Sequence, residues 1–201
     1  MMYKKIESLI SLLDFESIPQ DRIQKLDRLI AFIQTKKDKG EKILLNFICT
    51  HNSRRSQFAQ VWAQIASEYY KIKANCYSGG VEITACNERT VNTLSKIGFK
   101  VEKNGTENPM YTIEWSNNKK ILKLHSKLYD DARNPKTNFA AIMTCNHVDQ
   151  NCPYVSGCEE RISLPYSDPK NYDDTLLEST FYTYRSTEIA TEMFYVFSKI
   201  K

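Results

Sequence analysis

The apolar positions of the chain separate segments that are buried on both faces from segments that are buried on one. Residues 43–48 form a nearly continuous apolar run, which is typical of a strand covered on both faces of a sheet. Residues 58–66 instead repeat apolar side chains at helical spacing, which indicates an amphipathic helix. The same two kinds of pattern predict strands over residues 73–78, 139–143 and 161–164, and helices over residues 88–97 and from about 176 to 198.

This alternation of strands and helices predicts one fold class. Strands joined through helices make right-handed crossovers and pair in parallel. We therefore expect an α/β fold with a four-stranded, mostly parallel sheet and helices on both faces. Gly79 and Gly80 follow the second strand and predict a turn, and Gly98 stands where a glycine commonly ends a helix.

The first forty residues form a helical segment of their own. Two amphipathic helices are predicted over residues 3–38, broken at residues 17–19, with Asp21 as the N-cap of the second. A charged stretch then separates residues 1–40, an N-terminal helical extension, from a main domain over residues 41–201. We expect the apolar faces of these helices to pack on the main domain or on another copy of the chain.

The middle of the chain departs from simple alternation. Residues 111–115 and 120–124 are rich in residues that favour strands, and they flank a polar turn at residues 116–118. This pattern predicts a β-hairpin. We expect this hairpin to be an insertion, and the resemblance described below implies that it lies near the candidate site.

Composition narrows the class of protein without naming a reaction. The 201 residues are 41% hydrophobic and 26% charged, as in an ordinary globular protein. A net charge of +4 gives no argument for nucleic acid or a membrane as a partner, and no apolar run approaches the roughly 20 residues that span a bilayer. The chain begins with a helix-like segment instead of a signal peptide, so we expect a cytoplasmic location. Six cysteines there suggest thiol chemistry or a metal instead of structural disulfides.

The candidate chemistry centres on the loop between the first strand and helix 58–66. Cys49 ends the strand, and the loop leads into a helix N-terminus, where backbone N–H groups and the helix dipole favour anions. The same field stabilises a thiolate, which makes Cys49 the expected nucleophile. Arg55 can hold a tetrahedral oxyanion with two N–H donors. The residues expected to bind this oxyanion are Thr50, His51, Asn52, Ser53, Arg54, Arg55 and Ser56. The alternative is that Cys49 only ends a core strand before an ordinary surface loop.

Two further segments follow strand ends and should reach the same edge of the sheet, which is where ligands bind in folds of this class. Cys145 and Cys152 lie after strand 139–143, and Asp168 lies after strand 161–164. The seven-residue spacing of the two cysteines in a polar loop would let a flexible segment bring either sulfur forward.

Other interpretations of these residues remain open at this point. Cys145 could be a core residue, Cys152 a surface thiol and Asp168 part of an Asp-Pro turn. Cys76 and Cys86 are expected to be structural. A zinc site is conceivable, and its residues would be Cys145, His147, Cys152 and Cys158. Their spacing lacks the close Cys-x2-Cys pairs of common zinc modules, so we expect no metal.

Four stretches, in this order, resemble the low-molecular-weight protein tyrosine phosphatase superfamily. They are Cys49–Ser56 followed by Gln57 and Ala59, then Tyr77–Glu82, Thr144–Pro153 and Asp168–Pro169. Within that superfamily the resemblance is nearest to thioredoxin-coupled arsenate reductases. It runs from about Lys42 to the C-terminus, with an altered middle.

The resemblance implies a reaction as well as a fold. Cys49 would attack arsenate held by the loop and Arg55, with Asp168 as the acid. Cys145 would then attack the Cys49 sulfur and expel arsenite, and Cys152 would move the disulfide to a Cys145–Cys152 pair. Thioredoxin would reduce that pair as an external reductant. No bound cofactor is implied, and the substrate would be a small oxyanion.

A phosphatase is the alternative that the same resemblance leaves open. It would hydrolyse a phosphomonoester through a phosphocysteine at Cys49 and would need neither Cys145 nor Cys152. Thr50 favours the reductase, because tyrosine phosphatases usually place a bulky residue at this position.

Three residues depart from the family pattern. His51 stands where glycine is usual, and Arg54 stands where many relatives have a second cysteine, so a non-catalytic oxyanion-binding or redox-sensing protein is a third possibility. Gln60 replaces an acidic residue that is associated with potassium in some reductases, so we expect no bound potassium.

Overall fold

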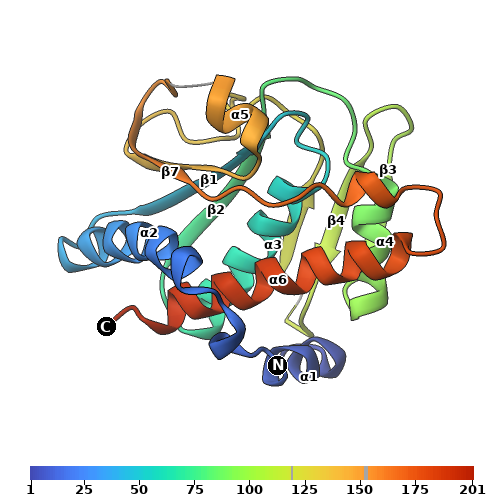
Figure 1. Cartoon of the computed structure of the whole chain (residues 1–201), viewed down its shortest axis with the longest axis horizontal. Helices are drawn as coiled ribbons and strands as arrows, with labels where there is room; N and C mark the ends of the chain where they lie inside the picture. Colours follow the sequence, from blue (N-terminus) through green and yellow to red (C-terminus); the bar gives the residue numbers. More distant parts are fainter. Residues whose placement is uncertain (119, 152–153) are drawn as a thin grey trace.

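A four-stranded parallel sheet lies at the centre of the molecule (Figure 1). The structure is a computed structural model, and it describes residues 1–118, 120–151 and 154–201. The strands, in their order across the sheet, are β2 (Ala74–Gly80), β1 (Ile43–Cys49), β6 (Phe139–Met143) and β7 (Cys158–Ser163). Every neighbouring pair is parallel, which confirms the predicted fold class.

Helices cover the two faces of this sheet unequally. One face packs against α2 (Gln20–Asp38) and α3 (Arg55–Tyr69), with α6 (Glu178–Ser198) behind α3. This side holds the larger core, in which Trp62 is fully buried and donates a hydrogen bond to Ser186 Oγ at 2.9 Å. The opposite face carries a smaller apolar cluster, to which the short helix α5 (Asn146–Asn151) contributes Val148.

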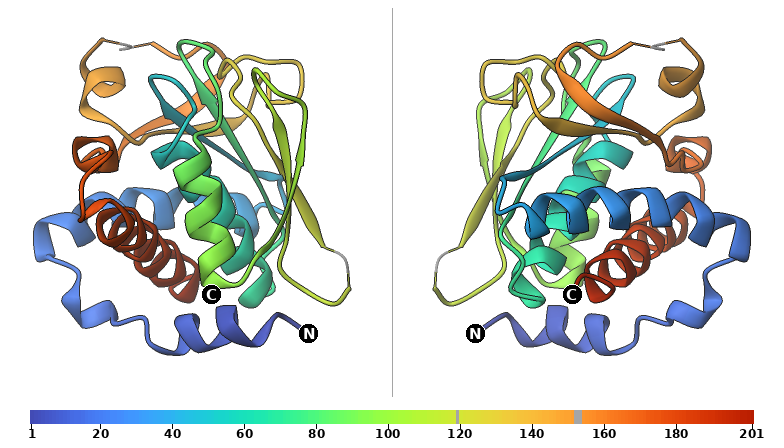
Figure 2. Two further views of the ribbon diagram at one scale, coloured as in Figure 1. Left: turned by 90° about the vertical axis from the view of Figure 1, so that its right-hand side faces the viewer. Right: turned by 90° about the vertical axis from the view of Figure 1, so that its left-hand side faces the viewer.

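The N-terminal extension belongs to the same core as the sheet. It consists of α1 (Lys4–Ser11), a 3-10 turn η1 (Phe15–Ser17) and α2, and it wraps around α6 (Figure 2). Three of its side chains, Leu26, Leu29 and Ile33, are fully buried in the larger core. The prediction that Asp21 caps the second helix is wrong. Pro19 occupies the N-cap without a side-chain hydrogen bond, and Asp21 lies in the first turn, where its negative charge suits the helix dipole.

The insertion is larger than the predicted hairpin. The hairpin itself is confirmed as β4 (Met110–Glu114) and β5 (Ile121–Leu124), and β3 (Lys100–Asn104) adds a third antiparallel strand. β3 has largely exposed, mostly polar side chains, so the hydrophobic pattern gave no sign of it. It follows α4 (Glu88–Ile97), which has the predicted bounds and ends at Gly98 with a φ of 123°.

The expectation of a turn at Gly79 and Gly80 is also wrong. Both residues extend β2, and they are glycines because other backbone segments come too close to leave room for a side chain. The Tyr129 backbone lies against Gly79, and the loop after Cys49 lies against Gly80.

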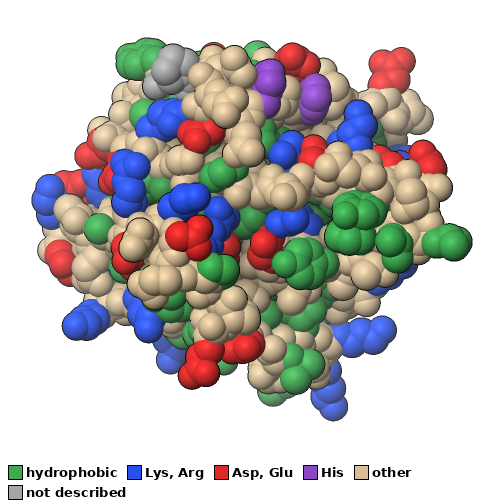
Figure 3. Space-filling model, in the orientation of Figure 1, with side chains coloured by type: hydrophobic (Ala, Val, Ile, Leu, Met, Phe, Trp, Pro, Cys, Tyr) green, Lys and Arg blue, Asp and Glu red, His purple; other side chains and the backbone are tan. Residues whose placement is uncertain are grey.

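The surface and the helices give two further facts about the whole chain. Acidic and basic side chains are interspersed over the face that Figure 3 shows. Within the described ranges, none of the helices is both long and apolar enough to cross a membrane.

The shared core makes a prediction about cooperativity. Replacing Leu29 with Ala should lower the free energy of unfolding by about 2–5 kcal/mol, because Leu29 is fully buried between the extension and the rest of the chain. Leu12→Ala is the matched control, since Leu12 in the same extension is 81% exposed. Urea unfolding should show a single transition in both variants. A separate early transition for L29A would mean that the extension is an independent unit.

Candidate active site

The loop between β1 and α3 turns its carbonyl groups outward. The Thr50 carbonyl accepts the N–H groups of Val81 and Glu82 at 2.8 and 2.9 Å. The His51 carbonyl accepts the Ser126 hydroxyl at 2.7 Å. The Asn52 carbonyl accepts a hydrogen bond from Gln57 Nε2, and the Ser53 carbonyl accepts one from the Asn87 N–H. In a trans peptide the N–H points opposite to the C=O. The N–H groups of residues 51–54 are therefore turned toward the inner side of the loop, where an anion would lie.

Asn52 holds the loop in this shape. Its φ is +47°, a left-handed value that asparagine tolerates better than most residues. Its side chain accepts the Lys127 N–H at 3.1 Å and donates to Ser56 Oγ at 2.9 Å. The left-handed φ thus lies at Asn52 and not at His51, the position where the family usually has glycine.

Gly80 leaves room for the loop. A Cβ atom at this position would lie 2.7 Å from the Thr50 carbonyl oxygen and 2.8 Å from the Asn52 nitrogen. The carboxyl end of β2 therefore sets the space in which the loop can close.

Ser56 links the loop to the candidate nucleophile. Its Oγ lies 3.0 Å from the Cys49 sulfur, and both residues are buried. Since the Asn52 amide already donates to this hydroxyl oxygen, the Ser56 proton is free to point at the sulfur. A hydroxyl that donates to sulfur stabilises the thiolate form, which is the nucleophilic one.

Arg55 brings the acidic residue to the loop. Its Nη2 donates to Asp168 Oδ2 at 2.7 Å, and its Nη1 donates to the Tyr166 carbonyl at 3.2 Å. Its Nε is buried and has no hydrogen-bond partner among the described residues. A buried guanidinium donor without a partner is costly, so this N–H is available for a bound oxyanion.

Asp168 has its second oxygen bonded as well. Oδ1 accepts the Lys170 N–H at 3.1 Å and so caps the 3-10 turn η2 (Pro169–Tyr172). The structure therefore brings Asp168 to Arg55, at the end of the loop that Cys49 begins, and the Asp-Pro turn is present as well.

Arg54 and His51 direct their side chains to other partners. Arg54 donates from Nε to the Tyr182 hydroxyl at 2.7 Å and pairs with Asp173 at 3.1 Å. His51 Nε2 lies 3.1 Å from a Glu82 carboxylate oxygen near the surface. Both residues contribute backbone N–H groups to the loop, and the positive charge of Arg54 is largely balanced by Asp173.

The second expected thiol lies next to the loop. Cys145 is buried, and its sulfur lies 3.5 Å from Thr50 Oγ1, which also lies 3.4 Å from His147 Nδ1. Cys145 and Cys49 share the smaller apolar cluster on the face of α5. Cys152, the third thiol of the expected relay, lies outside the described residues.

The remaining cysteines can be compared with their expected structural role. Cys76 and Cys86 are buried free thiols, and burial raises both pKa values, that of Cys86 to about 12. Neither is therefore poised to ionise near neutral pH. In the described part of the chain no cluster of three or more His, Cys, Asp or Glu side chains is arranged to hold a metal ion.

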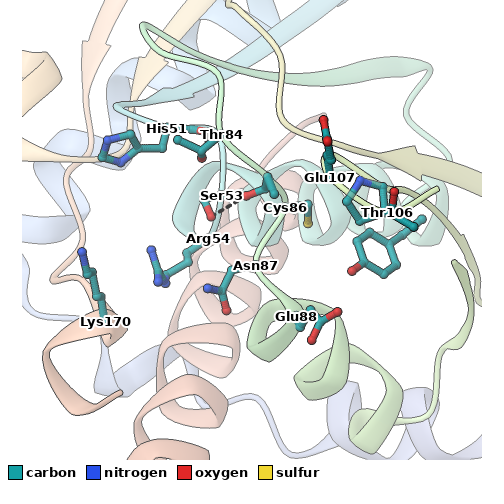
Figure 4. Close-up of a pocket in the computed structure, with 13 residues that line it drawn as sticks. His51, Ser53, Arg54, Thr84, Cys86, Asn87, Glu88, Thr106, Glu107 and Lys170 are labelled. Atoms are coloured by element: carbon teal, nitrogen blue, oxygen red, sulfur yellow. Dashed lines mark hydrogen bonds between the residues drawn. The ribbon is translucent and has the colours of Figure 1, made fainter. Parts of the chain in front are cut away.

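A groove of about 440 Å³ opens beside the loop (Figure 4). His51, Ser53 and Arg54 line it on the loop side, and Lys170 lies at the same end. Residues 84–88 line the groove next to the loop, to which they are hydrogen-bonded, and residues 106–111 of the insertion line its other side. The sequence placed the insertion near the site but not its residues in this wall, because hydrophobic patterning says nothing about which loops meet.

Lys127 is a residue of the site that sequence reasoning missed. Its backbone holds Asn52, while its ammonium group is buried without a hydrogen-bond partner among the described residues. Burial, aided by the charge of Arg133 and opposed by Asp131, lowers the pKa of Lys127 to about 8. A single lysine is usually a surface residue, so its burial could not be foreseen.

Comparisons with known proteins agree with this architecture. No family model matches the chain. It is 24% identical to an arsenate reductase of Bacillus cereus over 128 residues, which cover 64% of this chain and 78% of that protein. It is 26% identical to an arsenate reductase of Staphylococcus aureus over 129 residues, 64% of this chain and 79% of the relative.

Solved structures share the fold. An arsenate reductase from Archaeoglobus fulgidus matches with a TM-score of 0.53 at 14% identity, over 77% of this chain and 99% of its own. A low-molecular-weight protein tyrosine phosphatase from T. tengcongensis matches with a TM-score of 0.50 at 17% identity, over 79% of this chain and 100% of its own. These curated relatives and shared folds support a likeness to the low-molecular-weight protein tyrosine phosphatase superfamily, with arsenate reductases among the similar proteins. This confirms the resemblance read from the sequence. Both solved structures are named as enzymes. Nearly the whole of each of their chains aligns with this chain, and the alignment covers about three quarters of it.

The contact between Ser56 and Cys49 predicts a loss of thiol reactivity. Ser56→Ala should slow alkylation of Cys49 by iodoacetamide at pH 7 by about tenfold, the value of one hydrogen bond to a charged group. The modified Cys49 peptide is quantified by mass spectrometry. Ser67→Ala, in the same helix but bonded only to Gln64, is the control. Equal rates in S56A and the wild type would remove Ser56 from this role.

Burial of Lys127 predicts an unusual dependence of stability on pH. The folded state disfavours the charged amine, so wild-type stability rises as pH increases from about 8 to 10.5. Lys127→Met removes this term and should stabilise the protein at pH 7 by about 3 kcal/mol. The gain should shrink toward pH 10, as measured by urea unfolding at both pH values. A loss of stability at pH 7 would contradict the assigned burial of the charge.

Proposed function

We propose that the protein reduces arsenate to arsenite through a relay of thiols. The observation that carries the proposal is the Cys145 thiol, buried beside Thr50 at the edge of the oxyanion loop. A phosphatase of this architecture needs one thiol, whereas a reductase needs a second thiol within reach of the first. The relatives named arsenate reductase support the same choice.

In the first step Cys49 is the nucleophile. Its thiolate attacks the arsenic atom, so that an S–As bond forms and an As–O bond breaks. The inward N–H groups of residues 51–54 and the unpartnered Nε of Arg55 bind the remaining oxygens. A bound oxyanion competes with Asp168 for Arg55, and the released carboxyl group can deliver a proton to the departing oxygen.

In the second step Cys145 supplies the electrons. Its thiolate attacks the Cys49 sulfur, the S–As bond breaks, and the bonding pair stays on arsenic, which leaves as arsenite. A Cys49–Cys145 disulfide is formed. Cys152 then attacks the Cys145 sulfur and releases the Cys49 thiolate, and an external dithiol such as thioredoxin reduces the Cys145–Cys152 disulfide. The reaction needs no bound cofactor, and its dependence on reduced thiols goes with a cytoplasmic location.

The relay predicts different failures for two cysteine variants. Cys145→Ser should lose arsenate-dependent NADPH oxidation in the presence of thioredoxin and thioredoxin reductase, yet keep a Cys49 that phosphate protects from alkylation. Cys152→Ser should release one equivalent of arsenite and then stop. Cys158→Ser is the control for the third thiol, because Cys158 is close to Cys152 in sequence. Sustained turnover by C152S without another thiol would reject the relay.

A phosphatase is the second candidate, and the groove is what favours it. Arsenate has no leaving group larger than an oxygen, so a groove of about 440 Å³ beside the loop is more than it needs. The organic part of a phosphomonoester would fill this space, with Cys49 forming a phosphocysteine that water hydrolyses.

One side-by-side assay separates the two candidates. The wild type is given arsenate with the thioredoxin system in one arm and p-nitrophenyl phosphate in the other. We expect arsenate-dependent NADPH oxidation and slower phosphate release. Fast phosphate release without arsenate-dependent NADPH oxidation would select the phosphatase.

A further inference from the structure

Arg22 of the N-terminal extension reaches the loop that carries Asp168. It lies in the first turn of α2, and its Nη1 donates to the Pro165 carbonyl at 2.9 Å. Its guanidinium carbon lies 4.4 Å from the centre of the Tyr166 ring, which is a cation–π distance. Two consecutive residues that lead from β7 to Asp168 are thus held by one side chain from a segment more than 140 residues earlier.

Glu192 fixes Arg22 in this position. Nε and Nη2 of Arg22 donate to its two carboxylate oxygens at 2.6 and 2.9 Å, a two-pronged ion pair. The Tyr166 hydroxyl donates to the same carboxylate at 2.5 Å. The Arg22 and Glu192 side chains are only 13% and 5% exposed. A buried pair of this kind adds little net stability, but it holds its members in one arrangement.

Tyr166 connects this cluster to the candidate active site. Its carbonyl accepts Nη1 of Arg55 at 3.2 Å, and Asp168, two residues on, accepts Nη2 of the same guanidinium. Arg22 on one side and Arg55 on the other therefore contact the same short segment. A displacement of Pro165 and Tyr166 would move the carbonyl that orients Arg55 and the start of the turn that presents Asp168.

Packing alone does not hold this segment from behind. A cavity of about 520 Å³ lies there, lined by Pro165, Tyr166 and Ser167 together with residues of η1, α2 and α6. Arg22 lines this cavity and donates a hydrogen bond to the Pro165 carbonyl. At the far end of the loop, Asp173 is anchored by Arg54 and Tyr182. The segment from Pro165 to Asp173 is thus held by side-chain contacts at both ends. The contact nearer to Asp168 comes from the N-terminal extension.

We infer that Arg22 is a positioning residue for Asp168, so that the N-terminal extension contributes to the geometry of the site. The inference rests on the proposed function only in taking Asp168 as the general acid. It gives the extension a role beyond its share of the hydrophobic core. Arg22 touches neither substrate nor the reacting atoms, and it acts through Pro165 and Tyr166.

The experiment compares Arg22→Met, Arg22→Lys and the control Arg28→Met. Arg28 lies on the same helix and also contacts β7 residues, but it is exposed and remote from the loop. Phenyl phosphate and p-nitrophenyl phosphate serve as probes of the shared first step. Phenolate needs protonation to leave and p-nitrophenolate does not, so faulty positioning of the acid affects the first substrate alone.

Loss of positioning should appear as a change in leaving-group dependence. In R22M we expect kcat for phenyl phosphate to fall by about tenfold or more while kcat for p-nitrophenyl phosphate stays within about twofold. R22K should lie between R22M and the wild type, because one ammonium group cannot bond Glu192 and Pro165 together as a guanidinium does. R28M should match the wild type. An equal loss on both substrates would overturn the inference.

Hydrogen exchange provides a readout that does not depend on turnover. Residues 163–170 should exchange faster in R22M and R22K than in the wild type, with β1 and α3 unchanged. Unchanged exchange over residues 163–170 in both variants would overturn the inference even if the proposed function holds. The proposed function fails separately, if the wild type shows no arsenate-dependent NADPH oxidation with the thioredoxin system and arsenate does not protect Cys49 from alkylation. R22K keeps the charge, so it provides the comparison if R22M does not fold.

Discussion

The outward bonding of four carbonyl groups, those of residues 50 to 53, is the constraint on which the site depends. Each carbonyl that bonds to a neighbouring segment turns the following N–H toward the anion position. A single carbonyl turned inward would put partial negative charge where an oxyanion must lie. The partners come from the end of β2, from the segment around Ser126 and from α3, so the cradle exists only in the folded chain.

Arg55 extends this constraint to the chemistry. Its Nη1 donates to the Tyr166 carbonyl and its Nη2 donates to the Asp168 carboxylate. Its Nε has no partner among the described residues. One side chain therefore aligns the acid and keeps a donor for the ligand. Because Tyr166 is also held from behind by Arg22 and Glu192, the geometry of the acid depends on the helical extension as well as on the sheet.

The sequence predicted the parts of the molecule that depend on local patterns. The parallel sheet, α4 with its terminal Gly98 and the β4–β5 hairpin follow from periodicity and glycine placement, and the structure confirms them. β3 was missed because its side chains are mostly polar and exposed, so it lacks a buried face to produce a pattern. Asp21 was assigned as a cap from residue type alone, although the N-cap is Pro19, two residues earlier.

The candidate site also contains residues that local patterns predict and residues that depend on contacts between distant segments. Cys49, Asp168 and Cys145 were predicted to lie near one another because each follows a strand, and strand ends of a parallel sheet meet at one edge. The pairing of Arg54 with Asp173, the burial of Lys127 and the reach of Arg22 could not be found in this way. They depend on which distant segments touch, and single-sequence patterns carry no information about that.

Gly80 has a practical consequence. Its hydrogens face the Thr50 carbonyl and the Asn52 nitrogen at a separation that one extra methyl group would close. Replacing Gly80 with alanine would therefore disturb the anion-binding loop through steric contact alone. The inactive variant would keep every thiol, charge and hydroxyl group of the site.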